Sequence, residues 1–305
     1  MPSFTVFKGQ QDGSPRKSTT TKPDQLSGDN VYLKVTASGV CGTGKQITSP
    51  VGQDMVLGHE GIGVVEAVGP DVKYLQAGDR VGWGLPHPGQ GSFSTNGVWR
   101  EAFLHRIPDG MSDEIAAPLQ CSGATTFTAL QGVQPTDTVG IMGVGGLGHL
   151  AIQFAAKMEC RVVVFSGTEA KKEQSLALGA HEFVATRDAS SLSVTRPINR
   201  LLVTTSAQPQ WDLILPFMAA RSAIYPLSVS SGDFAIPYMP LIERGINVQG
   251  SLVAPRHLHR QMLDFAAHHR IEPIVEKFPM SEEGIKTALG KLEKGDVHYR
   301  AVLII

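Results

Sequence analysis

The sequence predicts an α/β protein in two parts, a mostly β part in the first third and a doubly wound parallel sheet in the second half. Three observations support this. Short apolar runs bounded by glycine and proline fill the first third, strand-like and helix-like segments alternate after Asp137, and a glycine-rich turn joins the first strand of that alternation to its first helix. A chain of 305 residues is long enough for two such parts.

The first third is typical of β structure because its apolar residues occur in short runs between turn residues. Residues 31–40 (VYLKVTASGV), 61–69 (GIGVVEAVG) and 79–84 (DRVGWG) predict strands. Residues 112–131 predict helical structure, with Ser112 as a suitable N-cap and two acidic residues in the first turn.

The second half alternates between the two kinds of element. DTVGIMG and RVVVFSG predict strands, and the segments GGLGHLAIQFAAKME and EAKKEQSLALGA predict the helices that follow them. Further strand-like runs follow, namely EFVAT, NRLLVTT, SAIYPLS and NVQGSLV. This alternation is typical of a parallel sheet covered by helices on both faces.

The composition is that of a globular protein without a nucleic-acid or membrane partner. Hydrophobic residues make up 42% of the chain, charged residues 18%, and the formal net charge is −1. No apolar run approaches the roughly 20 residues of a membrane span, and the N-terminus lacks the apolar core of a secretion signal. Three cysteines, Cys41, Cys121 and Cys160, are too few for a disulfide framework, which favours a reducing, cytoplasmic compartment.

The glycine-rich turn indicates a dinucleotide-binding site of the Rossmann type. Gly143, Gly145 and Gly148 have the G-x-G-x-x-G spacing, after a predicted strand and at the start of a predicted helix. Gly143 would allow the tight turn, Gly145 the approach of a pyrophosphate, and Gly148 the close packing of helix on strand. The helix N-terminus would attract the phosphates. A purely structural glycine turn is the alternative, since glycine is common in this chain.

The end of the next strand favours NADP(H) over NAD(H). An acidic residue there would bind the 2′-hydroxyl of NAD. Here the strand ends in Ser166, Gly167 and Thr168, and Lys171 and Lys172 follow shortly afterwards. Hydroxyls and cations suit a 2′-phosphate. The alternative is that both lysines only cover a solvated helix face.

Three loops carry residues that could share one metal ion. Cys41, His59 and Cys121 form a valid ligand set for a catalytic zinc, which needs about three protein ligands and one position left open. Glu60, beside His59, could be an extra oxygen ligand or could orient the histidine. Each residue taken singly has an ordinary structural interpretation, and spacing alone does not decide between the two.

The order of these motifs resembles the zinc-dependent medium-chain alcohol dehydrogenases, and within them the cinnamyl-alcohol-dehydrogenase-like branch. The segments that carry the resemblance are SGVCGT, GHEGIGVVEAVGPDV, GDRVG, LQCSGATTFTAL and GVGGLGHLAIQFAAKM. It implies a β-rich catalytic domain over residues 1–120, completed by residues 255–305, and a nicotinamide-binding domain over residues 121–254. It also implies one catalytic zinc held by Cys41, His59 and Cys121, with Glu60 adjacent, and a proton relay through the Thr43 hydroxyl.

Further cofactor contacts are predicted around the glycine turn and at three more distant positions. The residues are Gly146, Leu147, Thr205, Ser251 and Arg300. Arg300 could equally stabilise a sheet edge. The histidines in HLHRQ and AAHHR, namely His257, His259, His268 and His269, are expected to face water on helices.

The chain departs from the family pattern in two informative places. The family's four-cysteine lobe is missing after Gly84, so no structural zinc is predicted. The segment PFMAARSAIYP has Ala220, Arg221 and Ser222 where the family has a Pro-Gly-Gly turn, which predicts backbone strain if the turn needs a positive φ.

The resulting expectation is a zinc-dependent oxidoreductase that interconverts an alcohol and its aldehyde or ketone with NADP(H). Two alternatives stay open: an NADPH-dependent reductase of an activated C=C or C=N bond, and a catalytically impaired relative that still binds nucleotide. The expected partner is a small alcohol or carbonyl substrate. Members of the family that this chain resembles commonly dimerise through the edge of the nucleotide domain, so a homodimer is a possible assembly of this chain.

Overall fold

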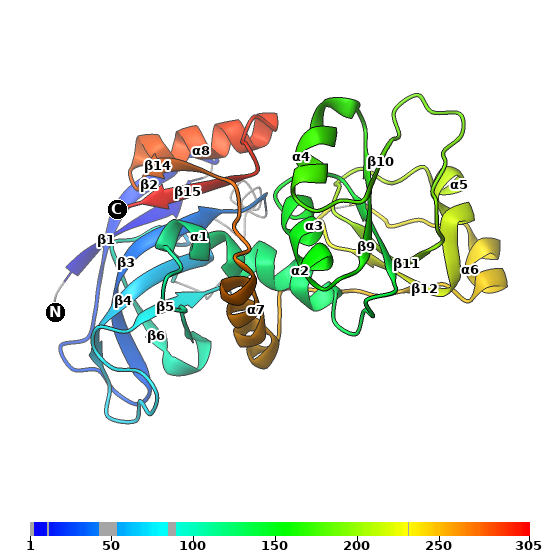
Figure 1. The fold of residues 1–305 in the computed structure, drawn as a ribbon. Helices are drawn as coiled ribbons and strands as arrows, with labels where there is room; N and C mark the ends of the chain where they lie inside the picture. The colour runs from blue at the N-terminus through cyan, green and yellow to red at the C-terminus, as the bar shows by residue number, and fades with distance from the viewer. Residues whose placement is uncertain (1–2, 11, 43–53, 85–89, 231) are drawn as a thin grey trace. The chain divides into compact units, whose positions relative to one another are not determined.

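A computed structural model describes residues 3–10, 12–42, 54–84, 90–230 and 232–305. Its contacts divide the chain into two compact units (Figure 1). The first unit comprises Met1–Cys121, Pro255–Ala267 and Glu272–Ile305, and the second comprises Ser122–Ala254 and His268–Ile271. The boundary near residue 121 falls within one run of helical structure.

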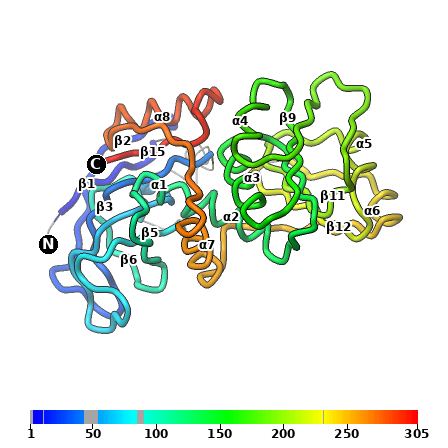
Figure 2. The backbone as a smooth tube through the Cα atoms, viewed as in Figure 1, coloured from blue at the N-terminus to red at the C-terminus, as the bar shows by residue number. Residues whose placement is uncertain are grey.

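The first unit is built on an open, mainly antiparallel sheet. Its strands, in the order in which they pair, are β14 (Val275–Pro279), β15 (Arg300–Ile304), β3 (Asn30–Val40), β4 (Glu60–Val68), β5 (Arg80–Trp83) and β7 (His105–Arg106), with β6 (Asn96–Arg100) on β3. A separate hairpin consists of β1 (Ser3–Gly9) and β2 (Pro15–Thr21). The last strand, β15, pairs with β3, so the two ends of the chain lie in the same unit (Figure 2).

The helices of this unit pack on the sheet through short apolar faces. They are α1 (Asp113–Pro118), α7 (Arg256–His269) and α8 (Glu282–Lys294). α8 has a complete set of end signals: the Ser281 hydroxyl accepts a hydrogen bond from the Gly284 N–H at 3.1 Å, and Gly295 ends the helix with φ +75°. Its buried Ile285 packs in one apolar cluster with Leu303 of β15. The C-terminal strand is thereby fixed beside β3.

The second unit is the predicted doubly wound sheet. Its strands, all parallel, pair in the order β10 (Glu182–Ala185), β9 (Arg161–Ser166), β8 (Thr138–Met142), β11 (Ile198–Val203), β12 (Met218–Pro226) and β13 (Asn247–Val248). In chain order this is 3-2-1-4-5-6, the dinucleotide-binding arrangement. The helices between and around the strands are α2 (Ala124–Ala129), α3 (Gly148–Lys157), α4 (Lys172–Ala177), α5 (Trp211–Ile214) and α6 (Tyr238–Arg244). The predicted fold class is confirmed.

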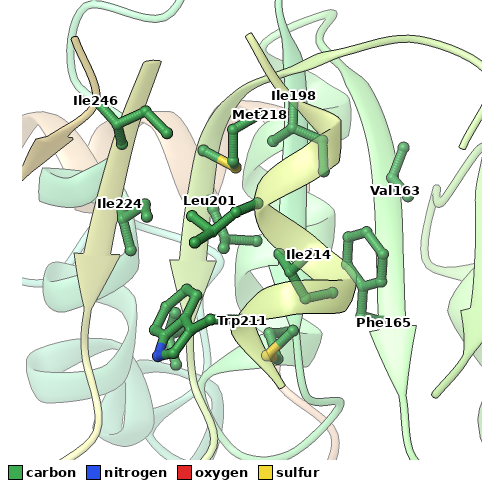
Figure 3. Close-up of a cluster of buried hydrophobic side chains, with 12 residues drawn as sticks. Val163, Phe165, Ile198, Leu201, Trp211, Ile214, Met218, Ile224 and Ile246 are labelled. Carbon is green, nitrogen blue, oxygen red and sulfur yellow. The ribbon is translucent and has the colours of Figure 1, made fainter. Parts of the chain in front are cut away.

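An apolar cluster packs against the strands of this unit. Figure 3 shows side chains of the central strands meeting those of α5, where Ile214 and Trp211 point towards the sheet. Leu201 and Ile198 of β11 are fully buried in this cluster. Because both faces of the sheet are covered, the strands are continuous apolar runs. The carboxyl ends of β8 and β11 then lie side by side, at the point where the strand order reverses.

The segment that replaces the family's glycine turn is strained, as the sequence predicts. Arg221 has φ +58°, a value that costs a non-glycine residue roughly 1–2 kcal/mol. The pairing of β11 with β12 shifts register at the same place, between Ile198 and Arg200. The chain therefore adopts a positive φ at Arg221 although no glycine is present there. Among the described residues, no helix is long and apolar enough to cross a membrane.

Candidate metal centre and cofactor loop

Four potential metal ligands of the first unit converge on one point. One ligand atom from each of Cys41, His59, Glu60 and Cys121 lies within 4.8 Å of all the others. Cys41 follows β3, His59 and Glu60 stand at the start of β4, and Cys121 lies in a single turn of π-helix, Leu119–Gly123, after α1. All three cysteines of the chain are free thiols, so Cys41 and Cys121 do not form a disulfide. π-Helical turns are frequent at functional sites.

Glycines beside the cluster make room for its side chains. Gly39 of β3 pairs with Glu60 of β4, and a side chain at Gly39 would overlap the Glu60 carboxylate. Gly58, with φ +83°, lies against Phe93 and Ser92, and a Cβ there would overlap both side chains. These glycines explain why a His-Glu pair stands in a glycine-rich segment: the backbone must turn sharply and approach its neighbours closely.

A buried ion pair holds the carboxylate of the cluster. The Arg300 guanidinium donates to both carboxylate oxygens of Glu60, at 2.6 Å for Oε1, and both residues are buried. Arg300 is the first residue of β15, whose next residue, Ala301, pairs with Val40. The predicted cofactor contact of Arg300 is not tested by this geometry. The structural role that the structure shows is the ion pair with Glu60 and not the predicted one at a sheet edge, because β15 lies between β14 and β3. Removing one partner would leave an unpaired buried charge.

The groups of the cluster shift one another's pKa values. Hydrogen bonding from the Cys121 thiol lowers the pKa of Cys41 well below the usual range, and the same bond raises the pKa of Cys121. Burial works to lower the pKa of His59, but the neighbouring Cys41 sulfur outweighs it and raises the value. Burial raises the pKa of Glu60 to about 7 against the opposing charge of Arg300. Without a cation, these groups would have to share protons.

The donor set fits a zinc ion. Ligands of a tetrahedral zinc lie roughly 3.3–3.8 Å apart, since Zn–S and Zn–N distances are about 2.3 and 2.0 Å. The convergence within 4.8 Å therefore needs only small adjustments to enclose one ion. Two thiolates and one imidazole would neutralise the ion. The Glu60 charge is already balanced by Arg300, so the cluster does not depend on a fourth protein ligand.

Next to Cys121, the first unit contains a buried pair of histidines. The rings of His105 and His259 stack at 4.0 Å, and Nε2 of His259 lies 3.0 Å from Oε1 of Gln120. Burial lowers the pKa of His105 to about 4 and that of His259 to about 3, so both rings are neutral. The prediction that His259 faces water is therefore wrong. α7 is amphipathic, and His259 falls on the same face as its buried Met262 and Leu263.

The glycine loop of the second unit turns sharply between β8 and α3. Gly143 has φ +94°, and a Cβ at that position would lie 2.6 Å from Cγ2 of Thr205. A side chain at Gly148 would overlap the Gly143 carbonyl, so this glycine allows α3 to begin close to β8. At Gly145, by contrast, a Cβ would meet nothing within 4 Å, so the space in front of the loop is open. Gly146 and Leu147 complete the turn into α3.

The end of β9 presents small residues to the same side of the sheet. Ser166 ends the strand, and Gly167 and Thr168 are exposed. The Lys171 ammonium donates to the Val144 carbonyl of the glycine loop at 2.6 Å. Burial lowers the pKa of Lys171. Lys172 pairs with Glu169 at 3.0 Å on the surface.

The remaining predicted residues are placed as follows. Ser251 belongs to the second unit, and its hydroxyl is buried without a hydrogen-bond partner among the described residues. The Thr205 hydroxyl donates to the Ala207 carbonyl at 3.0 Å. Thr43, the predicted proton relay, lies outside the described residues, as do residues 85–89 at the predicted lobe deletion.

Comparisons with known proteins identify the family. The family described as zinc-binding dehydrogenase matches residues 146–268, and the alcohol dehydrogenase GroES-like domain matches residues 27–109. A protein named "Probable formaldehyde dehydrogenase" from Bacillus subtilis (strain 168) is 32% identical, over 95% of this chain and 94% of that protein. The chain belongs to the zinc-dependent medium-chain alcohol dehydrogenases.

Other relatives place this medium-chain dehydrogenase near the cinnamyl alcohol dehydrogenases. An aldehyde reductase from Synechocystis is 29% identical over 92% of this chain and 93% of that protein. The structure of a cinnamyl alcohol dehydrogenase from Sorghum bicolor matches with a TM-score of 0.88 and 26% identity, over 99% of this chain and 98% of that one. The resemblance of the sequence motifs to this family is confirmed, and the enzyme is an oxidoreductase of alcohols and carbonyl compounds.

Two features of this dehydrogenase's sites are not predicted by its sequence. Neither the His105–His259 stack nor the Arg300–Glu60 pair has a signal in residue spacing, since their members are far apart in the chain. Arg187, which lies beside Gly167, is a further residue of this kind, but it has a usable signal: it lies two residues after the end of β10, the strand that borders β9. In a parallel sheet the carboxyl ends of neighbouring strands lie together.

Proposed function

We propose that this dehydrogenase interconverts an alcohol and its aldehyde or ketone with one catalytic zinc ion and NADP(H). The observation that carries the proposal is the convergence of Cys41, His59 and Cys121 around one point, with Glu60 neutralised by Arg300 beside them. Two sulfurs and one imidazole are a catalytic zinc set with one position left for substrate. No second cluster of this kind occurs among the described residues, and no structural zinc is proposed.

Cys41, His59 and Cys121 would hold the zinc. The bound ion would supply a Lewis acid that stabilises negative charge on the substrate oxygen. Glu60 would act through its position: its carboxylate lies against Arg300 and next to His59, so it sets the charge around the ligands. We propose that the Thr43 hydroxyl, two residues after Cys41, carries the substrate proton away from the site.

The glycine loop would bind the pyrophosphate of the cofactor. The open space at Gly145 and the N-terminus of α3 support this proposal. The buried Ser251 hydroxyl supports it as well, because it has no hydrogen-bond partner among the described residues and a ribose or amide of the cofactor could supply one. The hydroxyls of Ser166 and Thr168, and the missing acid at the end of β9, favour the 2′-phosphate of NADP(H) over the 2′-hydroxyl of NAD(H).

We also infer that the protein acts in a reducing compartment, such as the cytoplasm, and that it forms a homodimer. The three free cysteines support the first inference. For the second, α6 and the edge strand β13 expose large apolar side chains, including Tyr238 (76%), Ile242 (61%) and Val248 (45%), next to unpaired backbone groups of the edge. A mass from light scattering that equals one chain would contradict the dimer.

Metal analysis of the purified full-length protein tests the proposed centre. The protein is expected to contain one equivalent of zinc, and Cys121→Ser is expected to lose it together with NADPH-dependent reduction of aldehydes. Cys160→Ala is the matched control, since Cys160 is the third free thiol and lies in the second unit. Wild-type protein without zinc, or full aldehyde reduction by Cys121→Ser, would contradict the proposal. Metal-independent reduction of an activated C=C or C=N bond would instead support the reductase alternative.

A further inference from the structure

The loop after β10 places a guanidinium at the predicted ribose end of the cofactor site. Backbone hydrogen bonds extend the β9–β10 ladder beyond both strands: the Thr186 N–H donates to the Ser166 carbonyl at 2.8 Å, and the Arg187 N–H donates to the Gly167 carbonyl at 3.1 Å. Arg187 is thus held in register opposite Gly167 by main-chain bonds. Its position follows from the sheet rather than from a loose loop.

The Arg187 side chain lies across Gly167. Its Nη2 is 3.7 Å, and its Nε 3.9 Å, from the position that a Cβ would occupy at Gly167. Because Gly167 has no side chain, the guanidinium is close to the backbone that follows β9. This is where the second strand of a dinucleotide-binding sheet meets the adenosine ribose.

The charge of Arg187 is not neutralised by the protein. In the part of the chain that the structure describes, its exposed side chain makes no hydrogen bond or ion pair. Glu169, the acidic residue of the turn that follows β9, is paired with Lys172. The Thr186 hydroxyl is also occupied, since it donates to the Ser166 carbonyl at 3.2 Å. Arg187 therefore offers an unshared, forked set of donors, which suits a phosphate.

Lys171 is in a different situation. Its ammonium donates to the Val144 carbonyl, so one of its donors already ties α4's first turn to the glycine loop. Burial lowers the pKa of Lys171, whereas the Arg187 side chain is exposed. The contrast separates two roles: Lys171 supports the loop that receives the pyrophosphate, and Arg187 is available for an anion beyond the end of β9.

We propose that Arg187 is the residue that selects NADP(H) by binding the 2′-phosphate of its adenosine ribose, together with the Ser166 and Thr168 hydroxyls. This inference rests on the proposed NADP(H) preference and names the side chain that produces it. Lys171 is a positioning residue in this scheme, because it acts through the glycine loop and affects NADP(H) and NAD(H) alike.

The test compares the binding of NADPH and NADH, measured by titration calorimetry, to the full-length protein and four variants, one of which, Lys171→Ala, tests the role of Lys171. Arg187→Ala is expected to weaken NADPH binding by about 30-fold, the effect of losing charge-assisted hydrogen bonds, and to leave NADH binding within about twofold. Arg187→Lys, which keeps the charge without the fork, is expected to fall between. Arg196→Ala is the matched control: it removes an exposed arginine of the same unit at the amino end of β11, away from the carboxyl ends.

The outcomes separate this inference from the proposed function. If the wild type prefers NADPH and Arg187→Ala keeps that preference, Arg187 is not the selecting residue and the NADP(H) proposal stands. If Arg187→Ala weakens both cofactors equally, its role is structural and the inference is wrong. If the wild type binds NADH at least as tightly as NADPH, the proposed cofactor itself fails. A Lys171→Ala variant that loses only NADPH affinity would transfer the role to Lys171.

Discussion

The metal centre is formed by side chains, whereas the glycine loop is formed by backbone. The metal centre consists of side chains that follow β3, lie at the start of β4, belong to the π-helical turn or begin β15, and it includes the buried pair of Glu60 and Arg300. The glycine loop consists of backbone, from one strand, one turn and one helix that follow each other in the chain. Charge balance controls the first, and the absence of side-chain volume controls the second. The two should therefore fail under different substitutions.

The largest effect is expected where charge balance is broken. Arg300→Met would leave the Glu60 carboxylate buried without its partner, so the free energy of unfolding should fall by about 3–5 kcal/mol. The double variant Glu60→Gln, Arg300→Met should recover much of that loss. Urea unfolding of the metal-loaded protein measures both. Arg100→Met, which breaks the exposed pair with Asp29, is the control and should change stability little. Equal losses for the two arginines would contradict the comparison.

In the glycine loop, the stability of the protein should instead depend on added side-chain volume, and it should do so at Gly148 but not at Gly145. Gly148→Ala should lower the free energy of unfolding by about 3 kcal/mol, because its Cβ would overlap the rigid Gly143 carbonyl. Gly145→Ala has open space and should keep the stability of the wild type while weakening cofactor binding. Thermal unfolding with and without NADPH distinguishes the two. A stable Gly148→Ala protein would show that the loop can relax.

A smaller effect is expected from the neutral histidine pair. The pKa values of His105 and His259 in the folded protein lie below the ordinary value of about 6.5. As the pH decreases through 6.5, these histidines therefore bind protons in the unfolded chain but not in the folded protein, and the free energy of unfolding decreases. Glu60 acts with the opposite sign because its folded pKa is raised. Comparison with His105→Phe cancels that contribution. From pH 7.5 to 5.5 the wild type should lose about 1 kcal/mol more than His105→Phe. Parallel pH profiles would contradict the assignment of a neutral His105.

The smallest expected effect is a gain in stability. Arg221 is exposed and has φ +58°, so Arg221→Gly should raise the free energy of unfolding by about 0.5–1 kcal/mol. Ala220→Gly is the matched control in the same strand, at a residue without a positive φ, and should lower stability instead. Chemical unfolding of both variants checks the sign. A loss in Arg221→Gly would show that the arginine side chain contributes more than its backbone strain costs.

The sequence predicts the local features of this molecule well. The doubly wound sheet follows from the alternation of strand and helix, and the sharp turn at Gly143 follows from the glycine spacing. The strain at Arg221 is also readable, because a residue type that disfavours positive φ stands where the family has glycine. In each case the physical cause acts over a few neighbouring residues.

Contacts between residues that are far apart in the chain could not be predicted from the sequence. His259 was expected on a solvated helix face, but its ring stacks on His105, which lies more than 150 positions earlier in the chain. The pairing of Arg300 with Glu60 likewise depends on β15 lying beside β3. The ligands Cys41, His59 and Cys121 were predictable as candidates, and only the folded backbone brings them within 4.8 Å.

Arg300 comes after all the proposed zinc ligands in the chain, and this affects the order of events during synthesis. Every proposed zinc ligand leaves the ribosome before the arginine that balances Glu60, and β3 stays without one neighbour until β15 emerges. A nascent chain that has emerged only as far as Cys121 therefore contains every proposed zinc ligand while the Glu60 carboxylate still lacks the guanidinium that balances it.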